Sequence, residues 1–168
     1  MAIHRLETCS HHVDDPDRPS CDDTKAGKSM GCKKTCTEEG YGAAYGDDKH
    51  KADSVYSLSL AINAEESIQR DIMENGPVAA GFMVFSDFPA YKSGVYHYTG
   101  GMPLGGHAIK IIGWGVVEET GEKYWTVVNS WNEQWGDNGT FKIRRGRDEC
   151  GIERMGAYAG KVSYNPTF

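Results

Sequence analysis

The sequence predicts an α+β fold that is mainly antiparallel β, with one short helix and a disulfide-rich loop region at the N-terminal end. The composition changes near residue 55 from polar and cysteine-rich to apolar and periodic. One segment beyond this point has the apolar spacing of a helix, and several short apolar runs separated by turn residues follow it. The 168 residues can bury one core of ordinary size. We therefore expect a loop-rich segment over residues 1–54 and an antiparallel β-barrel-like domain over residues 55–168.

The loop-rich segment is rich in Asp, Lys, Gly and Pro and has almost no aliphatic periodicity, so cross-links rather than a core would order it. Four of the five cysteines lie in it, and the fifth stands alone near the other end: Cys9, Cys21, Cys32, Cys36 and Cys150. In an oxidising compartment this odd number leaves at least one thiol outside the intrachain disulfides. In a reducing compartment the first four would be candidate metal ligands instead.

A short amphipathic helix is predicted from Asn63 to Asn75. Asn63 can cap it, Glu66 stands at the reciprocal capping position, and Ile68 and Ile72 fall four residues apart on one face. The sequence Asn-Gly-Pro then ends the helix. Strands are predicted over residues 78–85, 95–98, 107–114, 123–129, 140–145 and 157–162.

The charge balance excludes some classes of partner. Eighteen basic against 24 acidic residues give a net charge of -6, which argues against nucleic acid as the partner. A membrane-spanning helix needs an apolar run of about 18 residues, and no run in the sequence is that long. The first residues have no apolar stretch typical of a signal peptide. We therefore expect neither a nucleic acid nor a membrane as a partner. The triplet Asn138-Gly139-Thr140 is a glycosylation motif that mildly favours a secretory history, although Asn-Gly is also a common turn.

One histidine, His107, is a candidate catalytic residue because of its sequence context. His107 follows two glycines in the run GGHAIKIIGWG, and the blocks NSWNEQWGDNG and CGIE come later in the strand region. A neutral histidine that takes and returns a proton needs an acceptor on its second ring nitrogen, and the amide oxygen of Asn129 can serve without adding a buried charge. The indole of Trp131 can cover that hydrogen bond and keep water from competing for it. The three residues together indicate a hydrolase site.

These three blocks resemble the C-terminal half of papain-like cysteine peptidases, and the pair His11-His12 after Cys9 makes the cathepsin B group the nearest likeness. The resemblance implies a papain-like right-hand β-barrel domain and no cofactor or metal. It makes His107 the catalytic histidine, Asn129 its orienting residue, and Trp131 and Gly106 supporting residues. It also implies a lysosomal or secreted peptidase acting on peptides or proteins, with cystatin-like inhibitors as further partners.

The family nucleophile is not found at its expected place. In such enzymes it lies in a Cys-Gly-Ser/Ala-Cys-Trp/Tyr motif about 130 to 150 residues before the histidine. Only 106 residues precede His107, and none of them matches the motif. We therefore expect the nucleophile to fall before Met1, in a missing N-terminal domain, together with the oxyanion-hole glutamine, whose loss typically costs about 3 kcal/mol of transition-state stabilisation. The chain alone would be inactive.

The resemblance also gives a role to the N-terminal segment. Residues 9–21 resemble an occluding loop, closed by a disulfide between Cys9 and Cys21, whose two histidines bind the C-terminal carboxylate of a peptide. His11 and His12 would then direct the enzyme toward removing C-terminal dipeptides.

Several positions depart from the cathepsin B pattern or complete it. Arg18 matches the arginine that tethers the loop, but Gln134 replaces its aspartate partner. Met155 occupies the place of an acidic residue in the second specificity pocket, so we expect an apolar preference there. Ala108 is a further substrate-binding position. Cys32 and Cys36 resemble cysteines whose partners lie in the missing portion.

Two other hypotheses remain open at this point. The chain could be a non-catalytic module that keeps the cleft wall to bind a peptide or an inhibitor. Alternatively, the N-terminal cysteines and histidines could hold a zinc ion, although their spacing fits structural zinc sites poorly.

Overall fold

The computed structural model of the protein describes residues 40, 42, 44–47, 52–59 and 63–161. The chain divides into two compact units, Met1–His50 and Lys51–Phe168. In the first unit a backbone hydrogen bond from Asp47 N to Ala44 O (3.0 Å) closes a turn.

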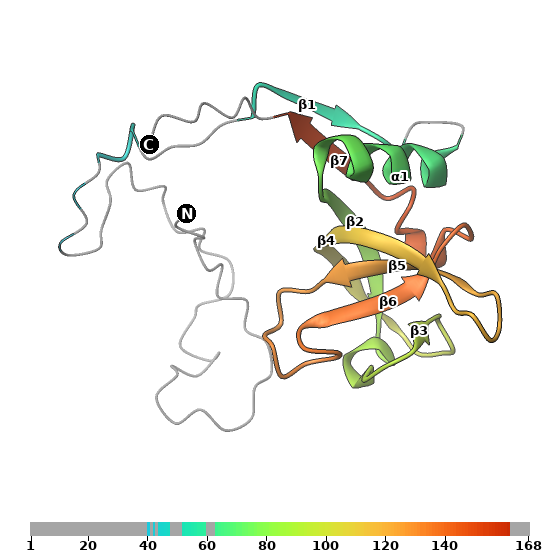
Figure 1. The fold of residues 1–168 in the computed structure, drawn as a ribbon. Helices are drawn as coiled ribbons and strands as arrows, with labels where there is room; N and C mark the ends of the chain where they lie inside the picture. Colours follow the sequence, from blue (N-terminus) through green and yellow to red (C-terminus); the bar gives the residue numbers. More distant parts are fainter. Residues whose placement is uncertain (1–39, 41, 43, 48–51, 60–62, 162–168) are drawn as a thin grey trace. The chain divides into compact units, whose positions relative to one another are not determined.

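A seven-stranded sheet and one α-helix make up the second unit (Figure 1). The elements are β1 (Ser54–Ser57), α1 (Ala64–Asn75), β2 (Val78–Phe85), β3 (Val95–Tyr96), β4 (Pro103–Val116), β5 (Lys123–Val128), β6 (Thr140–Arg144) and β7 (Ala157–Lys161), with the 3₁₀ turns η2 (Phe88–Ala90) and η3 (Glu149–Gly151). The strand order is β1-β7-β2-β4-β5-β6-β3, and every pairing is antiparallel except that of β3 with β6. The predicted fold class, with one helix and a mainly antiparallel sheet, is confirmed.

Two details of the sheet were not predicted. β1 extends the sheet at Ser54, where the sequence predicts loop, and it pairs with β7. β4 is also longer than predicted at both ends. Over the described residues, no helix combines the length and apolar character needed to cross a bilayer.

Buried and more exposed side chains alternate along much of the central strands β2, β4, β5 and β6, and the buried side chains form the core. In β2, every second residue from Val78 is buried, and β5 buries Trp125 and Val127 in the same way. The core also holds the fully buried side chains Phe82, Phe88, Phe141, Ile68, Ile111, Ile143 and Ile152. A sheet face built from such alternation holds each strand in one register, since a slip by one residue would expose the apolar set.

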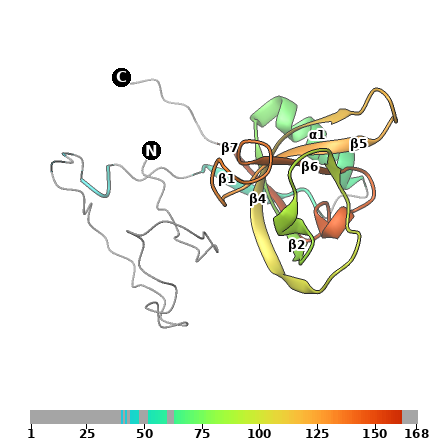
Figure 2. The same cartoon turned by 90° about the horizontal axis from the view of Figure 1, so that it is seen from below.

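Helix α1 packs beside β7 (Figures 1 and 2). Ile68 is its fully buried contact residue, and Gly76 ends the helix with a positive φ and a backbone hydrogen bond to Ile72 O. Asn63 occupies the predicted N-cap position, and its backbone oxygen accepts from Ser67 N (3.0 Å), but its side chain makes no capping hydrogen bond. Its amide nitrogen instead donates to the Glu66 carboxylate (Nδ2 to Oε2, 3.4 Å).

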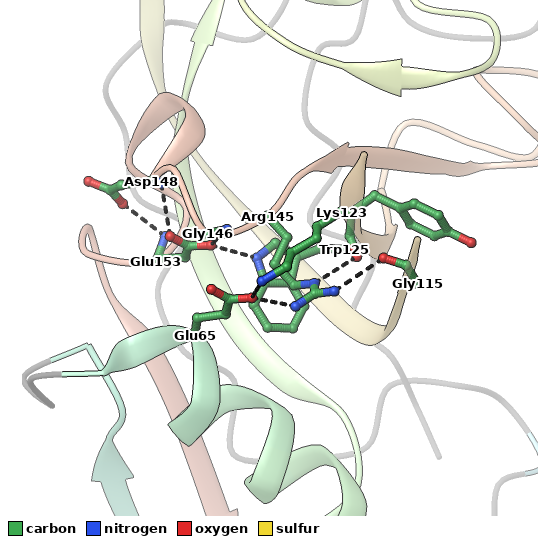
Figure 3. Close-up of polar contacts among 9 residues, drawn as sticks. Glu65, Gly115, Lys123, Trp125, Arg145, Gly146, Asp148 and Glu153 are labelled. Carbon is green, nitrogen blue, oxygen red and sulfur yellow. Dashed lines mark hydrogen bonds and ion pairs between the residues drawn. The ribbon is translucent and has the colours of Figure 1, made fainter. Parts of the chain in front are cut away.

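A buried arginine ties α1 to the sheet (Figure 3). Arg145 donates from Nη2 to Gly115 O (3.2 Å), from Nε to Tyr124 O (3.3 Å) and from Nη1 to the Glu65 carboxylate in the first turn of α1. Its guanidinium also lies 5.5 Å from the ring centre of Trp125. Three hydrogen-bond acceptors, one of them a carboxylate, and one aromatic ring therefore compensate this buried cation.

A buried carboxylate completes this cluster on the other side of Trp125. Glu153 accepts hydrogen bonds from Trp125 Nε1 (3.0 Å), Gly146 N (2.6 Å) and Asp148 N (2.8 Å). These bonds fix the turn between β6 and β7 against the sheet (Figure 3).

Candidate active site

His107 lies in β4 at the edge of the apolar core. It pairs with Phe82 of β2 and lies on the same strand face as the buried residues Ile109 and Ile111. Its ring is partly buried, and its centre lies 6.1 Å from that of Phe82. The strand therefore presents the imidazole at the edge of an apolar interior, with one side left toward solvent.

Asn129 is placed by the neighbouring strand β5. It continues the inward-facing alternation of Trp125 and Val127 and is 9% exposed. Its backbone N–H donates to Gly139 O (2.9 Å), which anchors it to the turn that precedes β6. Because Lys110 pairs with Val128, continuing the antiparallel register brings Asn129 beside the segment that carries His107.

A hydrogen bond of 2.8 Å joins His107 Nε2 to Asn129 Oδ1. The same oxygen accepts a second hydrogen bond from the backbone N–H of Ser130 (2.8 Å). A backbone N–H can only donate, so the atom between the two groups is the carbonyl oxygen, and Nε2 of the histidine must carry a proton. In the neutral ring the lone pair is therefore on Nδ1.

Nδ1 is the nitrogen of the neutral ring that is left to act as a base. It makes no hydrogen bond to any described residue, so it is available to accept a proton from an incoming group. After accepting it, the imidazolium still donates from Nε2 to a neutral amide. The arrangement is that of a general base held in one tautomer.

The indole of Trp131, which two further rings support, lies against the ring of His107. The ring centre of Trp131 lies 5.2 Å from that of His107, at an interplanar angle of 34°. Phe88 and Trp135 support this indole edge-on, at 5.4 and 4.9 Å between ring centres. Such packing lowers the local dielectric and strengthens the hydrogen bond of the imidazole.

The loop that carries Trp131 is itself fixed. Asn132 Oδ1 accepts hydrogen bonds from the backbone N–H groups of Gln134 (2.8 Å) and Trp135 (3.1 Å). Trp135 Nε1 donates to Pro89 O (3.0 Å) and joins this loop to η2. The residues Phe88, Trp135 and Gly139 were not predicted as part of the site, and the only sequence signal for the last two is their place in the block NSWNEQWGDNG.

The predicted substrate-binding residues within the described part of the chain lie close to His107 in the strand or beside its neighbour Gly106. Met155 is half exposed, and its terminal methyl lies 3.9 Å from the point where a Cβ on Gly106 would stand. Gly106 and Ala108 are exposed on either side of His107 in β4. Gln134 is also exposed. The remaining predictions, on Cys9, His11, His12, Arg18, Cys21, Cys32 and Cys36, lie outside the described residues.

The one cysteine within the described residues is not suited to act as a nucleophile. Cys150 is a free thiol that packs against the core, with Sγ 3.9 Å from Glu149 Oε1. Burial, together with the Glu149 carboxylate, raises the pKa of the Cys150 thiol to about 12. It therefore stays protonated at neutral pH.

Comparison with known proteins agrees with this geometry. The sequence model of the family described as "Papain family cysteine protease" matches residues 13–160. A cathepsin B-like cysteine proteinase 3 of Ostertagia ostertagi is 48% identical over 159 residues, covering 95% of this chain and 86% of the relative. A cathepsin B-like cysteine proteinase of Schistosoma japonicum is 50% identical over 145 residues, covering 86% of this chain and 40% of the relative. The solved structure of procathepsin B S9 from Trypanosoma congolense matches with a TM-score of 0.68 and 37% identity, over 80% of this chain and 42% of that one.

The family match covers most of the chain, and the chain therefore belongs to the papain family of cysteine proteases. Within this family, the relatives named above are cathepsin B-like, which confirms the resemblance read from the sequence. The chain spans most of the length of the Ostertagia relative, but only 40% of the Schistosoma relative and 42% of the trypanosome structure.

Proposed function

We propose that this chain is the histidine-bearing half of a cathepsin B-like peptidase that hydrolyses peptide bonds. The observation that carries the proposal is the bond between His107 Nε2 and Asn129 Oδ1 (2.8 Å), which leaves the lone pair on Nδ1. A cysteine thiol facing Nδ1 would lose its proton to the imidazole, and the imidazolium would stabilise the thiolate.

The hydrolysis would proceed in two stages. The thiolate attacks the carbonyl carbon of the peptide bond, and the His107 imidazolium returns its proton to the departing amine. A water molecule then gives a proton to the same imidazole and hydrolyses the thioester. Asn129 keeps the ring oriented in both stages, and Trp131 keeps bulk water away from their hydrogen bond.

The nucleophilic cysteine and the oxyanion-hole glutamine would come from an N-terminal domain outside residues 1–168. Two sequence observations support this: no match to the nucleophile motif precedes His107, and none of the four tryptophans follows a cysteine. The only thiol among the described residues, Cys150, is the protonated one discussed above. Residues 1–168 alone would then have no peptidase activity.

The substrate would be a peptide or protein. His11 and His12 would bind its C-terminal carboxylate, behind a loop closed by Cys9 and Cys21, which favours the release of dipeptides over endopeptidase cleavage. The thioether of Met155, beside Gly106, supports an apolar preference in the second specificity pocket. We further propose a lysosomal or secreted location, no cofactor, and cystatin-like inhibitors as partners.

A peptidase assay with two substrates tests this function. Residues 1–168, with and without the supplied N-terminal domain, are mixed with a dipeptide amide and with a peptide that has a free C-terminus. We expect turnover only when both parts are present, and labelling by a thiol-directed inhibitor on the N-terminal domain. Turnover by residues 1–168 alone would overturn the proposed division of the active site. Peptide binding without turnover in either mixture would instead support the non-catalytic module.

A further inference from the structure

We propose that Asn138 is a site of N-glycosylation, on the turn that supports the candidate active site. Asn138-Gly139-Thr140 is the only Asn-X-Ser/Thr triplet in the chain whose central residue is not proline. The one other triplet of this form, Asn165-Pro166-Thr167, is excluded by its proline. The inference rests on the secretory route included in the proposed function.

The acceptor side chain is exposed. Asn138 lies in the turn between Trp135 and β6 with a φ of 51°, a left-handed conformation that asparagine tolerates. Paired backbone bonds between Asp137 and Thr140 (Asp137 N to Thr140 O, 2.9 Å; Thr140 N to Asp137 O, 3.0 Å) close this turn. The shape of the turn therefore does not depend on the Asn138 side chain.

The amide of Asn138 has a hydrogen to spare. Nδ2 donates to Asp137 Oδ1 at 3.2 Å, and an amide nitrogen carries two hydrogens. A sugar can replace the second hydrogen while the first stays in its bond. Asn129 provides the contrast, because its Nδ2 is fully buried and could not carry a glycan in the folded protein.

The turn by itself also favours Asn and Gly at these positions. Gly139 has a φ of 78°, and a Cβ there would lie 3.0 Å from Asn132 O, so the backbone alone favours glycine at this position. Residue identity therefore does not decide the matter. The exposed amide and its second hydrogen are what let the folded protein carry a glycan at Asn138. The Thr140 hydroxyl donates to Asp137 O (2.7 Å) in the folded turn, so the hydroxyl would take part in the transfer before this turn closes.

The sugar would be transferred to Asn138 from a lipid-linked pyrophosphate oligosaccharide. A bond forms between Asn138 Nδ2 and the anomeric carbon of the first sugar, and the bond from that carbon to the pyrophosphate oxygen breaks. The amide nitrogen loses one proton, and the lipid pyrophosphate leaves. The attached glycan would lie one residue from Gly139, whose carbonyl holds the Asn129 backbone.

Mass spectrometry of the secreted protein tests the inference. The full chain is expressed in eukaryotic cells behind a heterologous secretory leader, and glycans are released in heavy-oxygen water by an amidase that converts the carrier asparagine to labelled aspartate. Because an Asn-Gly sequence also deamidates without a glycan, label is counted only as the excess over a parallel sample that receives no amidase. We expect this label at Asn138 in the wild type and in Thr140→Ser, which keeps the hydroxyl. We expect none in Thr140→Val, which keeps the shape but not the hydroxyl, and no glycan on Asn138→Asp.

An unlabelled Asn138 in the secreted wild type would overturn the inference, as would label that persists in Thr140→Val. Folding is checked separately by resistance of the secreted chain to trypsin. Because occupancy is read by mass and the leader is supplied, the result is independent of peptidase activity. Failure of this inference is thereby distinguished from failure of the proposed function.

Discussion

At the scale of single residues, the site depends on a single amide. The Asn129 oxygen accepts from both His107 Nε2 and Ser130 N, so the amide cannot rotate by 180° without losing both bonds. A carboxylate would hold the ring equally well but would add a charge in a buried place, which the amide avoids.

Replacing Asn129 with alanine should therefore impair catalysis in the complete enzyme. The ring of His107 would lose its orienting acceptor, and kcat/KM for a peptide amide should fall by about ten- to hundredfold, with most of the loss in kcat. Ser130→Ala is the matched control, because only its backbone takes part. An unchanged kcat/KM in Asn129→Ala would show that the hydrogen bond has no catalytic role.

A second residue-scale prediction concerns stability at alkaline pH. The pKa of Cys150 is raised to about 12 from its ordinary value of 9.0, so the folded state holds the proton that the unfolded state releases. This contribution to stability is complete below the unfolded pKa and is lost as the pH rises toward the folded pKa. Burial also raises the pKa of Tyr96, which contributes in the same direction.

Urea unfolding of the wild type and Cys150→Ala, at about pH 8 and about pH 10, measures this effect. The wild type should lose more of its free energy of unfolding between the two pH values than the variant, which lacks the thiol. Equal losses in both proteins would contradict the assigned environment of Cys150.

At the scale of elements, the attachment of α1 is set by charge as well as by Ile68. Arg145 is almost fully buried, and Glu65 is its only acidic partner among the described ion pairs. Removing one partner of such a pair leaves a buried charge uncompensated.

Glu65→Ala should lower the free energy of unfolding by about 2 kcal/mol. Glu66→Ala is the matched control, because Glu66 lies in the same helical turn and is exposed. Within the described residues its carboxylate accepts a hydrogen bond from Asn63, so the effect of its loss should stay within about 0.5 kcal/mol. Thermal and urea unfolding measure both variants. Equal effects would mean that the helix dipole, and not the Arg145 pair, accounts for the contribution of Glu65.

The elements also show what periodicity can predict. The strand pattern gave β2 its observed bounds and placed α1 within one residue, because apolar alternation and turn residues are local properties. It could not predict β1, whose four residues are polar or exposed in part and pair only with β7. The pair Glu65–Arg145 joins residues 80 positions apart, so no local pattern indicates it.

At the scale of the whole molecule, the candidate site was predictable to the level of residues but not of atoms. His107, Asn129 and Trp131 were identified by motif, and the structure brings the three together. The backbone N–H of Ser130 identifies which atom of the Asn129 amide faces the ring, and hence that Nε2 carries the proton, and that information exists only in three dimensions. The supporting rings Phe88 and Trp135 were missed for the same reason.

In the proposed function, Nδ1 of His107 receives a proton from a thiol outside residues 1–168. The rate of alkylation of that thiol in the complete enzyme, at about pH 6, tests the claim most directly. An ordinary thiol with a pKa of about 8.5 is nearly all protonated at this pH, whereas a thiolate paired with the imidazolium is not. The account predicts that His107→Ala lowers the alkylation rate by about a hundredfold, and equal rates in wild type and variant would contradict it.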